Sequence, residues 1–298
     1  MLPKDIIKEI RKIEIQTGKL VNEVLAGEYH SIFKGSGMEF SDVRIYQEGD
    51  DIRQVDWNVT ARTGFPHVKQ FIEERELTIM LLADVSASGT FGSHCRLKRE
   101  MAAQACAMLA FSAIQNNDKI GAIIFSNRIE KFIPPKKGRK HALQVIRELL
   151  YFSPREQGTS IKEAINYLNG VIKRRCVVFL VSDFLDEGYE RVMRYAARKH
   201  DLIAINVTDP HEEELPDLGL ISIEDPETGE SVLIDSSDRI ARQQYRELRQ
   251  TFRENRRKLL RSMGVDQIEL STDRSFADPL VRFFKLRMRL RSSRRATG

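Results

Sequence analysis

The stretch LTIMLLADVSASG, residues 77–89, decides the fold class. It begins with a short, continuous apolar run, which predicts a strand that is buried on both faces. Asp84, Ser86 and Ser88 alternate in the loop that follows, so their side chains share one side of the chain. Ligands of open α/β sheets bind at the carboxyl ends of strands, and this loop is therefore the first candidate site.

Similar apolar runs recur along the chain, and helical patterns separate them. This alternation predicts a Rossmann-like, doubly wound and mostly parallel sheet of the α/β class, with helices on both faces. Residues 128–133 can pair back on the preceding strand as an edge strand. The further apolar runs cover residues 119–125, 176–181 and 202–207, and the helical patterns cover residues 97–116, 140–152, 161–171 and 189–199.

Both ends of the chain depart from this alternation. Residues 3–26 show helical periodicity, residues 28–75 are rich in turns and partly β, and residues 219–235 predict an inserted β-hairpin. A long charged helix, a last strand and a last helix are predicted at residues 237–262, 266–270 and 277–290. We therefore expect an N-terminal extension over residues 1–75, an α/β domain over residues 76–290 and a basic tail over residues 291–298.

Composition excludes several classes of protein. The 48 Lys and Arg residues nearly balance the 43 Asp and Glu residues, so the net charge of +5 does not by itself indicate nucleic-acid binding. Cys95, Cys106 and Cys176 are scattered, which indicates neither a disulfide framework nor a zinc site and fits a reducing compartment. The sequence shows no signal peptide and no apolar run of the roughly 20 residues that span a bilayer. We expect a soluble, cytoplasmic protein.

Two more polar segments follow predicted elements of the sheet. Ser182 and Asp183 follow the third buried strand, and Gly158, Thr159 and Ser160 precede a helix. Carboxylate and hydroxyl oxygens of this kind suit magnesium, with calcium or manganese as the other possibilities. A shell rich in hydroxyls neutralises little of the charge of the ion, so an open coordination position would attract a carboxylate from another molecule.

An Asp-x-Ser-x-Ser loop with a later threonine and a later aspartate resembles the metal-ion-dependent adhesion site of von Willebrand A domains. The resemblance assigns metal-ligand roles to Asp84, Ser86, Ser88, Thr159 and Asp183. Each residue also has a simpler reading as a loop residue or a helix cap, and Thr159 and Ser160 compete for the threonine's role. Without a base, a P-loop or a second aspartate beside Asp84, the pattern favours a binding module over an enzyme.

The segment before the first strand carries alternating charges and aromatic rings. Such spacing suits a network of ion pairs braced by aromatic packing, either to lock the segment onto the sheet or to recognise a partner. Together with the metal motif, it resembles the bacterial family known as domain of unknown function 58, over about residues 30–285. The residues that carry this resemblance are Phe40, Arg44, Tyr46, Gly49, Asp50, Asp51, Arg53, Asp56, Trp57, Ala61 and Arg62. Members are often associated with MoxR-type AAA+ ATPases, so the resemblance implies an adaptor or co-chaperone that grips an acidic residue of that ATPase or of its client.

Two alternatives from other classes stay open. A metal-dependent phosphatase or hydrolase could use Asp84 as a phosphoryl acceptor. The basic C-terminal residues could instead contact nucleic acid or an anionic surface, although a final amphipathic helix that frays into a solvated tail is the favoured explanation. These basic residues are Lys285, Arg287, Arg289, Arg291, Arg294 and Arg295.

Overall fold

The computed structural model describes residues 38–73, 76–93, 96–152, 154, 158–224 and 229–296. The helix that we predict at residues 3–26, as well as His94 and Cys95, lies outside the described residues. The chain divides into two compact units, one formed by residues 33–77 and the other containing everything from Thr78 onward. No helix in the described part of the chain combines the length and the apolar character needed to cross a membrane.

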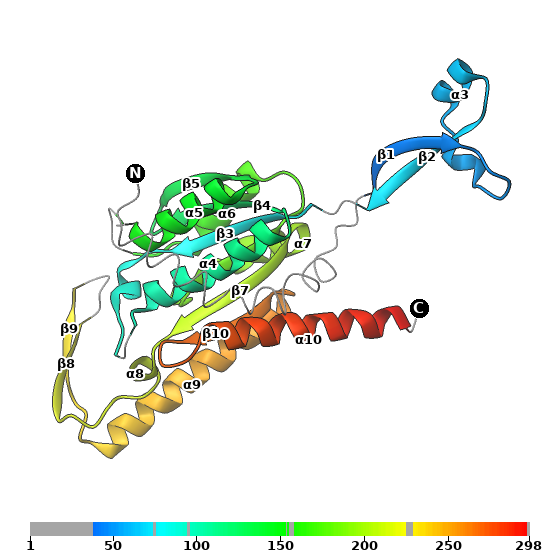
Figure 1. The fold of residues 1–298 in the computed structure, drawn as a ribbon. Coiled ribbons are helices and arrows are strands. Elements are labelled where there is room, and N and C mark those ends of the chain that lie inside the picture. Colours follow the sequence, from blue (N-terminus) through cyan, green and yellow to red (C-terminus); the bar gives the residue numbers. More distant parts are fainter. Residues whose placement is uncertain are drawn as a thin grey trace. The chain divides into compact units, whose positions relative to one another are not determined.

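The larger unit is built on one six-stranded sheet (Figure 1). Its strands are β3 (Thr78–Asp84), β4 (Lys119–Phe125), β5 (Ile129–Lys136), β6 (Val177–Ser182), β7 (Asp201–Thr208) and β10 (Asp266–Ser271). The order across the sheet is β10-β7-β6-β3-β4-β5, and only the edge strand β5 runs antiparallel to its neighbour. The predicted doubly wound, mostly parallel sheet is confirmed.

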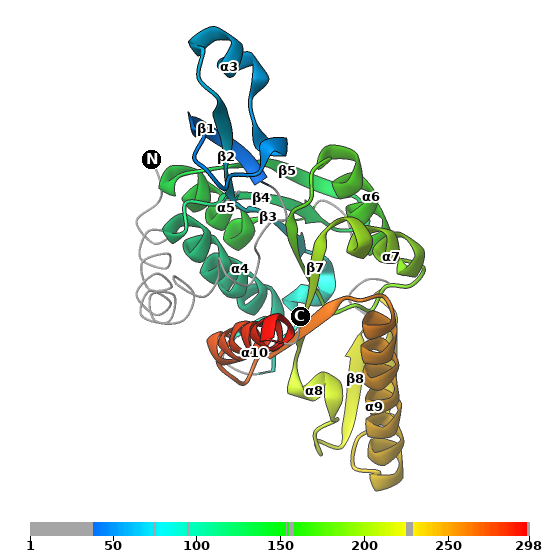
Figure 2. The same cartoon turned by 90° about the vertical axis from the view of Figure 1, so that its right-hand side faces the viewer.

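Helices cover both faces of this sheet, as Figure 2 shows. On one face, α6, α7 and α9 pack through Ile165, Met193 and Leu260 onto inward-facing residues of the strands. On the other face, α4 lies next to α5 and α10, and Phe284 of α10 packs edge to face against Phe179 of β6. The helices are α4 (Lys98–Gln115), α5 (Arg139–Tyr151), α6 (Ile161–Val171), α7 (Glu190–Lys199), α9 (Arg239–Ser262) and α10 (Ala277–Ala296).

The winding of the chain creates one place where ligands can bind. From β3 the chain continues through α4 to β4 on one side, whereas from β6 it continues through α7 to β7 on the other side. Because β3 and β6 are neighbours, the loops after them diverge and leave a crevice outside their carboxyl ends. Asp84 and Asp183 stand at this crevice.

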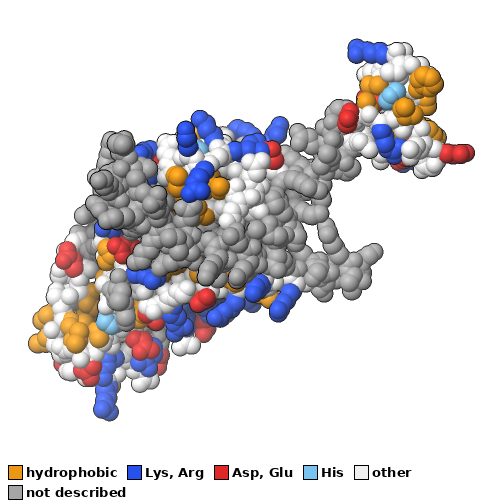
Figure 3. Space-filling view, in the orientation of Figure 1, with side chains coloured by type: hydrophobic (Ala, Val, Ile, Leu, Met, Phe, Trp, Pro, Cys, Tyr) orange, Lys and Arg blue, Asp and Glu red, His pale blue; other side chains and the backbone are white. Residues whose placement is uncertain are grey.

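The C-terminal additions lie outside the sheet core. A short helix, α8 (Pro210–Glu213), follows β7, and the inserted hairpin pairs β8 (Leu220–Glu224) with β9 (Ser231–Asp235). Exposed apolar side chains gather at this end of the unit, where the hairpin and the start of α9 meet (Figure 3). The last helix, predicted to end at residue 290, continues to Ala296.

The smaller unit is a hairpin with two short helical turns. Strand β1 (Met38–Ile45) pairs antiparallel with β2 (His67–Glu73), and the loop between them holds the 3-10 turn η2 (Ile52–Gln54) and the helix α3 (Trp57–Thr63). Asp51 caps η2 and Asp56 caps α3 through their carboxylates. Gly64 ends α3 with a φ of 77°, a left-handed conformation that glycine adopts without steric cost.

Candidate functional site

The loop after β3 is built around the carboxylate of Asp84. Its Oδ1 accepts a hydrogen bond of 2.9 Å from the amide of Ser86, and its Oδ2 accepts one of 2.6 Å from the hydroxyl of Ser182. The amide of Val85 continues the strand ladder by donating to the carbonyl of Phe125. The start of the loop is therefore fixed by the sheet, and Asp84 is joined to the end of the neighbouring strand β6.

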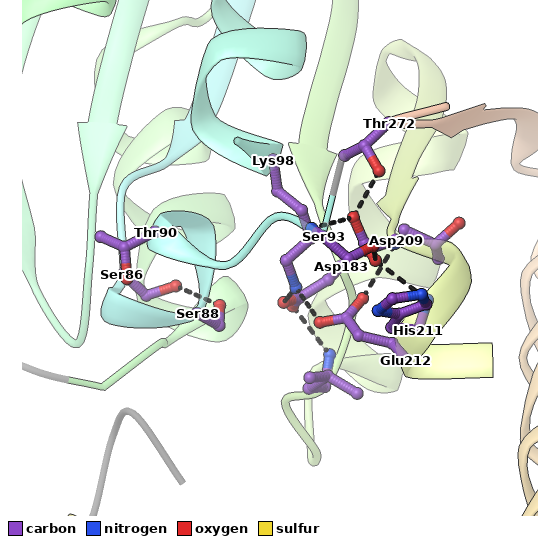
Figure 4. Close-up of polar contacts among 12 residues, drawn as sticks. Ser86, Ser88, Thr90, Ser93, Lys98, Asp183, Asp209, His211, Glu212 and Thr272 are labelled. Carbon is purple, nitrogen blue, oxygen red and sulfur yellow. Dashed lines mark hydrogen bonds and ion pairs between the residues drawn. The ribbon is translucent and has the colours of Figure 1, made fainter. Parts of the chain in front are cut away.

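The two serine hydroxyls of this loop converge. A 3-10 turn, η3 (Ala87–Thr90), begins directly after Ser86 and brings the Oγ of Ser88 to 3.0 Å from the Oγ of Ser86 (Figure 4). In an octahedral magnesium shell with ligands at about 2.1 Å, adjacent ligands are about 3.0 Å apart. Both serines are buried, so their hydroxyls are held in place rather than free to rotate into solvent. Their spacing fits two neighbouring ligands of one ion.

Asp183 reaches the same place from β6. Its neighbour Phe184 has a φ of 58°, which is uncommon for a bulky residue and turns the chain sharply after the strand. Two contacts hold that conformation. The buried ring of Phe184 packs against Tyr189, and the amide of Phe184 donates a hydrogen bond to the hydroxyl of Ser182. A strained residue that the surroundings fix in this way is a feature of functional sites.

Burial and a neighbouring carboxylate disfavour the charged form of Asp84. Burial raises the pKa of Asp84 to about 6, and the negative charge of Asp183 adds to the effect against the opposing hydrogen bonds from Ser182 and Ser86. A cavity of about 20 Å³ lies among Asp84, Ser86, Ser88 and Asp183. The two carboxylates and two convergent hydroxyls around this space are the kind of oxygen donors that a small divalent cation takes, and the side chains of Lys98 and Arg99 line the same space.

Thr159 and Ser160, the two candidates for one predicted ligand role, lie in the turn before α6. Ser160 is the N-cap of α6, since its hydroxyl accepts from the amide of Glu163, so its side chain is already engaged. The turn is held across the end of β3: the amide of Ser160 donates to Ser126 after β4, and the amide of Ile161 donates to Asp186 after β6. Thr159 lies within this turn, at the sheet edge that carries the metal loop.

Sequence reasoning missed a buried lysine in the crevice. The ammonium of Lys98, at the start of α4, lies 2.8 Å from Oδ2 of Asp183 and 2.6 Å from Oε1 of Glu212. Burial favours the neutral amine, but the two carboxylates outweigh it and raise the pKa of Lys98. One signal was available, because Lys98 lies three and seven positions before Met101 and Ala105 on the buried face of its helix.

A second buried aspartate, also unforeseen, follows β7. The carboxylate of Asp209 accepts hydrogen bonds from the amide and hydroxyl of Ser93, from the amide of His211 at 2.9 Å and from the hydroxyl of Thr272 at 2.5 Å. Burial would raise its pKa, but the bonds from Ser93 and Thr272 prevail and lower it. Asp209 also caps α8, and the carboxylate of Glu212 in α8 accepts a hydrogen bond from the amide of Asp209.

A larger cavity opens beside the loop that follows β3. It has a volume of about 230 Å³, and Ser86, Thr90 and Arg99 line it together with apolar residues of α4 and of the end of α5. The side chain of Arg99 is exposed at the edge of both this cavity and the small one. Among the described residues, no three His, Cys, Asp or Glu side chains converge as a metal-binding group, so any ion at the crevice relies on hydroxyl oxygens.

The residues of the N-terminal motif lie in the smaller unit. Arg44 and Asp50 form a two-pronged ion pair with both contacts at 2.6 Å, which lowers the pKa of Asp50. Asp51 and Asp56 are helix caps, and the described residues show no ion pair for Arg53 or Arg62. In place of the expected network, the described residues show one close ion pair, a longer contact of 3.9 Å between Lys69 and Asp56, and two helix caps.

The aromatic packing that we expected in this unit is also incomplete. Trp57 is 67% exposed, and Ile45, Ile52 and Phe65 are exposed to a similar degree. Gly49 has a φ of 105°, so the turn before Asp50 requires glycine. Tyr46 donates its amide to Pro66, which closes the base of the loop.

The basic C-terminal residues are partly engaged within the fold. Arg287 contacts Asp201 of β7 at 2.5 Å and Asp266 of β10 at 3.3 Å, and its side chain is largely buried. This arginine fastens α10 to the sheet. The side chains of Arg291, Arg294 and Arg295 lie outside the described part of the structure.

Comparison with known proteins identifies the family. The family model described as protein of unknown function DUF58 matches residues 42–255. The chain belongs to the DUF58 family. This DUF58 chain is 34% identical over 283 residues to an uncharacterised protein of Mycobacterium tuberculosis, a match that covers 94% of the chain and 89% of that protein. The family resemblance seen in the sequence is confirmed.

Solved structures also resemble this DUF58 chain. A crystal structure of an aerotolerance-related membrane protein from Bacteroides fragilis has a TM-score of 0.49 and 16% identity, covering 72% of the chain and 98% of that structure. Proximal thread matrix protein 1 from the mussel byssus, described with a zinc-occupied MIDAS motif, has a TM-score of 0.36 and 17% identity, covering 44% of the chain and 38% of that structure.

Proposed function

We propose that this chain is a protein-binding module whose grip depends on a divalent cation. The cation, magnesium in our proposal with calcium or manganese as substitutes, is held by Asp84, Ser86, Ser88, Thr159 and Asp183. The observation that carries the proposal is the convergence of two hydroxyls 3.0 Å apart with the carboxylates of Asp84 and Asp183 at the switch point of the sheet.

The ligand chemistry explains why the site would bind another molecule. Serine and threonine hydroxyls carry no charge, so much of the positive charge of the ion stays available to an outside oxygen ligand. A carboxylate is the strongest such ligand that a protein partner offers. Arg99, exposed at the rim, adds a second positive charge that favours the approach of an acidic segment.

The partner that we propose is a MoxR-type AAA+ ATPase or one of its clients. Support comes from the family to which the chain belongs and from the resemblance of its motifs. In this role the chain is an adaptor or co-chaperone and not an enzyme. The ion would bridge the module to an exposed Asp or Glu of the partner.

The test is a binding measurement with a purified MoxR-type ATPase and the immobilised chain. We expect binding with magnesium, loss of binding in EDTA, and loss of binding in Asp84→Ala with magnesium present. Circular dichroism of each sample controls for folding. Undiminished binding by a folded Asp84→Ala chain in EDTA would contradict the proposed function.

A further inference from the structure

The ammonium of Lys98 occupies an oxygen of Asp183, which is one of the proposed metal ligands. It is 3% exposed and sits between two carboxylates, 2.8 Å from Asp183 and 2.6 Å from Glu212, as Figure 4 shows. A lysine is rarely buried to this degree unless it is paired. Here the pairing uses Asp183, one of the residues that we assign to the cation.

Hydrogen bonds of the backbone fix the position of Lys98 at the start of α4. Its amide donates to the carbonyl of Phe91, and the carboxylate of Glu100 accepts from the amide of Leu97 directly before it. The start of α4 is thereby held, and the ammonium has little freedom to leave the crevice. An ion and this ammonium would therefore compete for the carboxylate of Asp183.

Glu212 is fixed just as firmly on the other side. Its Oε2 accepts from the amide of Asp209, while its Oε1 faces the ammonium, and its carbonyl accepts from the hydroxyl of Tyr245 on α9. Lys98 thus has a second partner that does not belong to the metal-ligand set. It can release Asp183 without becoming an unpaired buried charge.

We propose that Lys98 is a built-in counter-ion that sets the affinity of the crevice for its divalent cation. This inference rests on the proposed metal site. Without the cation, the ammonium neutralises Asp183 and keeps the two carboxylates of the crevice together. When the cation takes Asp183, the ammonium is retained by Glu212 alone. Lys98 is therefore a positioning and affinity-setting residue and not a metal ligand.

We expect substitutions of Lys98 and Glu212 to change the affinity for the cation in opposite directions. Removing the ammonium in Lys98→Met eliminates a positive charge next to a doubly charged ion, so cation binding tightens by about tenfold or more. Neutralising its second partner in Glu212→Gln leaves the ammonium dependent on Asp183, so cation binding weakens. A merely structural role for Lys98 would weaken binding in both variants.

The experiment is calorimetric titration with Mn²⁺ after removal of metal, on wild type, Lys98→Met, Glu212→Gln and Lys140→Met. Lys140→Met removes one exposed lysine of α5 and controls for net charge. Thermal melting in EDTA is measured in parallel, and we expect Lys98→Met to melt lower than wild type in EDTA and to recover most of the loss with Mn²⁺.

The result that overturns the inference is Mn²⁺ affinity in Lys98→Met that is equal to or weaker than that of wild type and Lys140→Met. If Lys98→Met does not fold, Glu212→Gln decides, since unchanged or tighter Mn²⁺ binding there also overturns it. Failure of the proposed function differs, because the Mn²⁺ affinities would shift as expected while the ATPase stays unbound. If no variant binds Mn²⁺, the inference falls together with the metal site.

Discussion

Asp84 and Asp209 both end buried parallel strands of the same sheet, yet their surroundings are opposite. Asp209 receives four hydrogen bonds from Ser93, His211 and Thr272, and its pKa is lowered. Asp84 receives bonds from Ser86 and Ser182 and faces the charge of Asp183, and its pKa is raised to about 6. The hydrogen-bond donors around Asp209 satisfy its carboxylate within the fold, whereas Asp84 has fewer donors, and we propose that its carboxylate is left for a cation.

The largest effect that the comparison predicts is on stability. Asp209→Ala removes the common acceptor of three segments and leaves buried hydroxyl and amide donors unpaired. We expect the free energy of unfolding to fall by about 3 kcal/mol or more, measured by urea denaturation. Asp209→Ala with wild-type stability would show that this cluster does not hold the fold.

The matched change at the other aspartate is expected to leave stability almost unchanged. In EDTA, Asp84→Ala loses two hydrogen bonds but also relieves the repulsion from Asp183, so the free energy of unfolding should change by less than about 1 kcal/mol. The same urea measurement checks it. A loss as large as that of Asp209→Ala would remove the distinction between the two aspartates.

A smaller effect, on partner binding only, is expected from the exposed Arg99 at the rim of the crevice. Arg99→Glu should weaken binding of the acidic partner by roughly tenfold, mainly through slower association at low salt, while Mn²⁺ affinity changes less. Surface plasmon resonance at two salt concentrations measures this. Arg191→Glu on α7, which changes the net charge equally, is the control, and equal effects of both variants would count against a local role for Arg99.

The smallest predicted effects distinguish the role of the Thr159 hydroxyl from that of the adjacent Ser160 hydroxyl. Thr159→Val should lower Mn²⁺ affinity by several-fold with little change in stability, because Thr159 is the proposed ligand. Ser160→Ala should lower the free energy of unfolding by about 1 kcal/mol, because Ser160 caps α6, and should leave Mn²⁺ affinity unchanged. Calorimetry and urea denaturation of both variants test this, and the reverse pattern would exchange the two roles.

Local sequence patterns predicted the sheet and the placement of Asp84, Ser86 and Ser88 in one loop at its edge, whereas the role of these residues as metal ligands stays a prediction. Buried parallel strands read as continuous apolar runs, so β3, β4, β6 and β7 were visible, and the edge strand β5 followed from the turn before it. Asp84, Ser86 and Ser88 were found because they are close in sequence and directly follow such a run. Asp183 was found because the carboxyl ends of parallel strands share one edge.

Contacts between distant segments could not be predicted in the same way. Lys98 meets Glu212 across 114 positions, and Ser93 meets Asp209 across 116, so no local periodicity links them. They are brought together by the right-handed crossovers and by the short helix α8, which the sequence analysis missed. In the smaller unit, Asp51 and Asp56 serve as helix caps, a role that their charge pattern alone does not reveal, and Asp56 also lies 3.9 Å from the ammonium of Lys69.

The most direct test of the central claim is a Mn²⁺ titration of the metal-free chain followed by electron paramagnetic resonance, with Asp84→Ala as the comparison. We expect one bound ion per wild-type chain and none at the same concentrations in the folded Asp84→Ala chain. Equal binding by both chains, or no binding by wild type, would contradict a divalent-cation site at the end of β3.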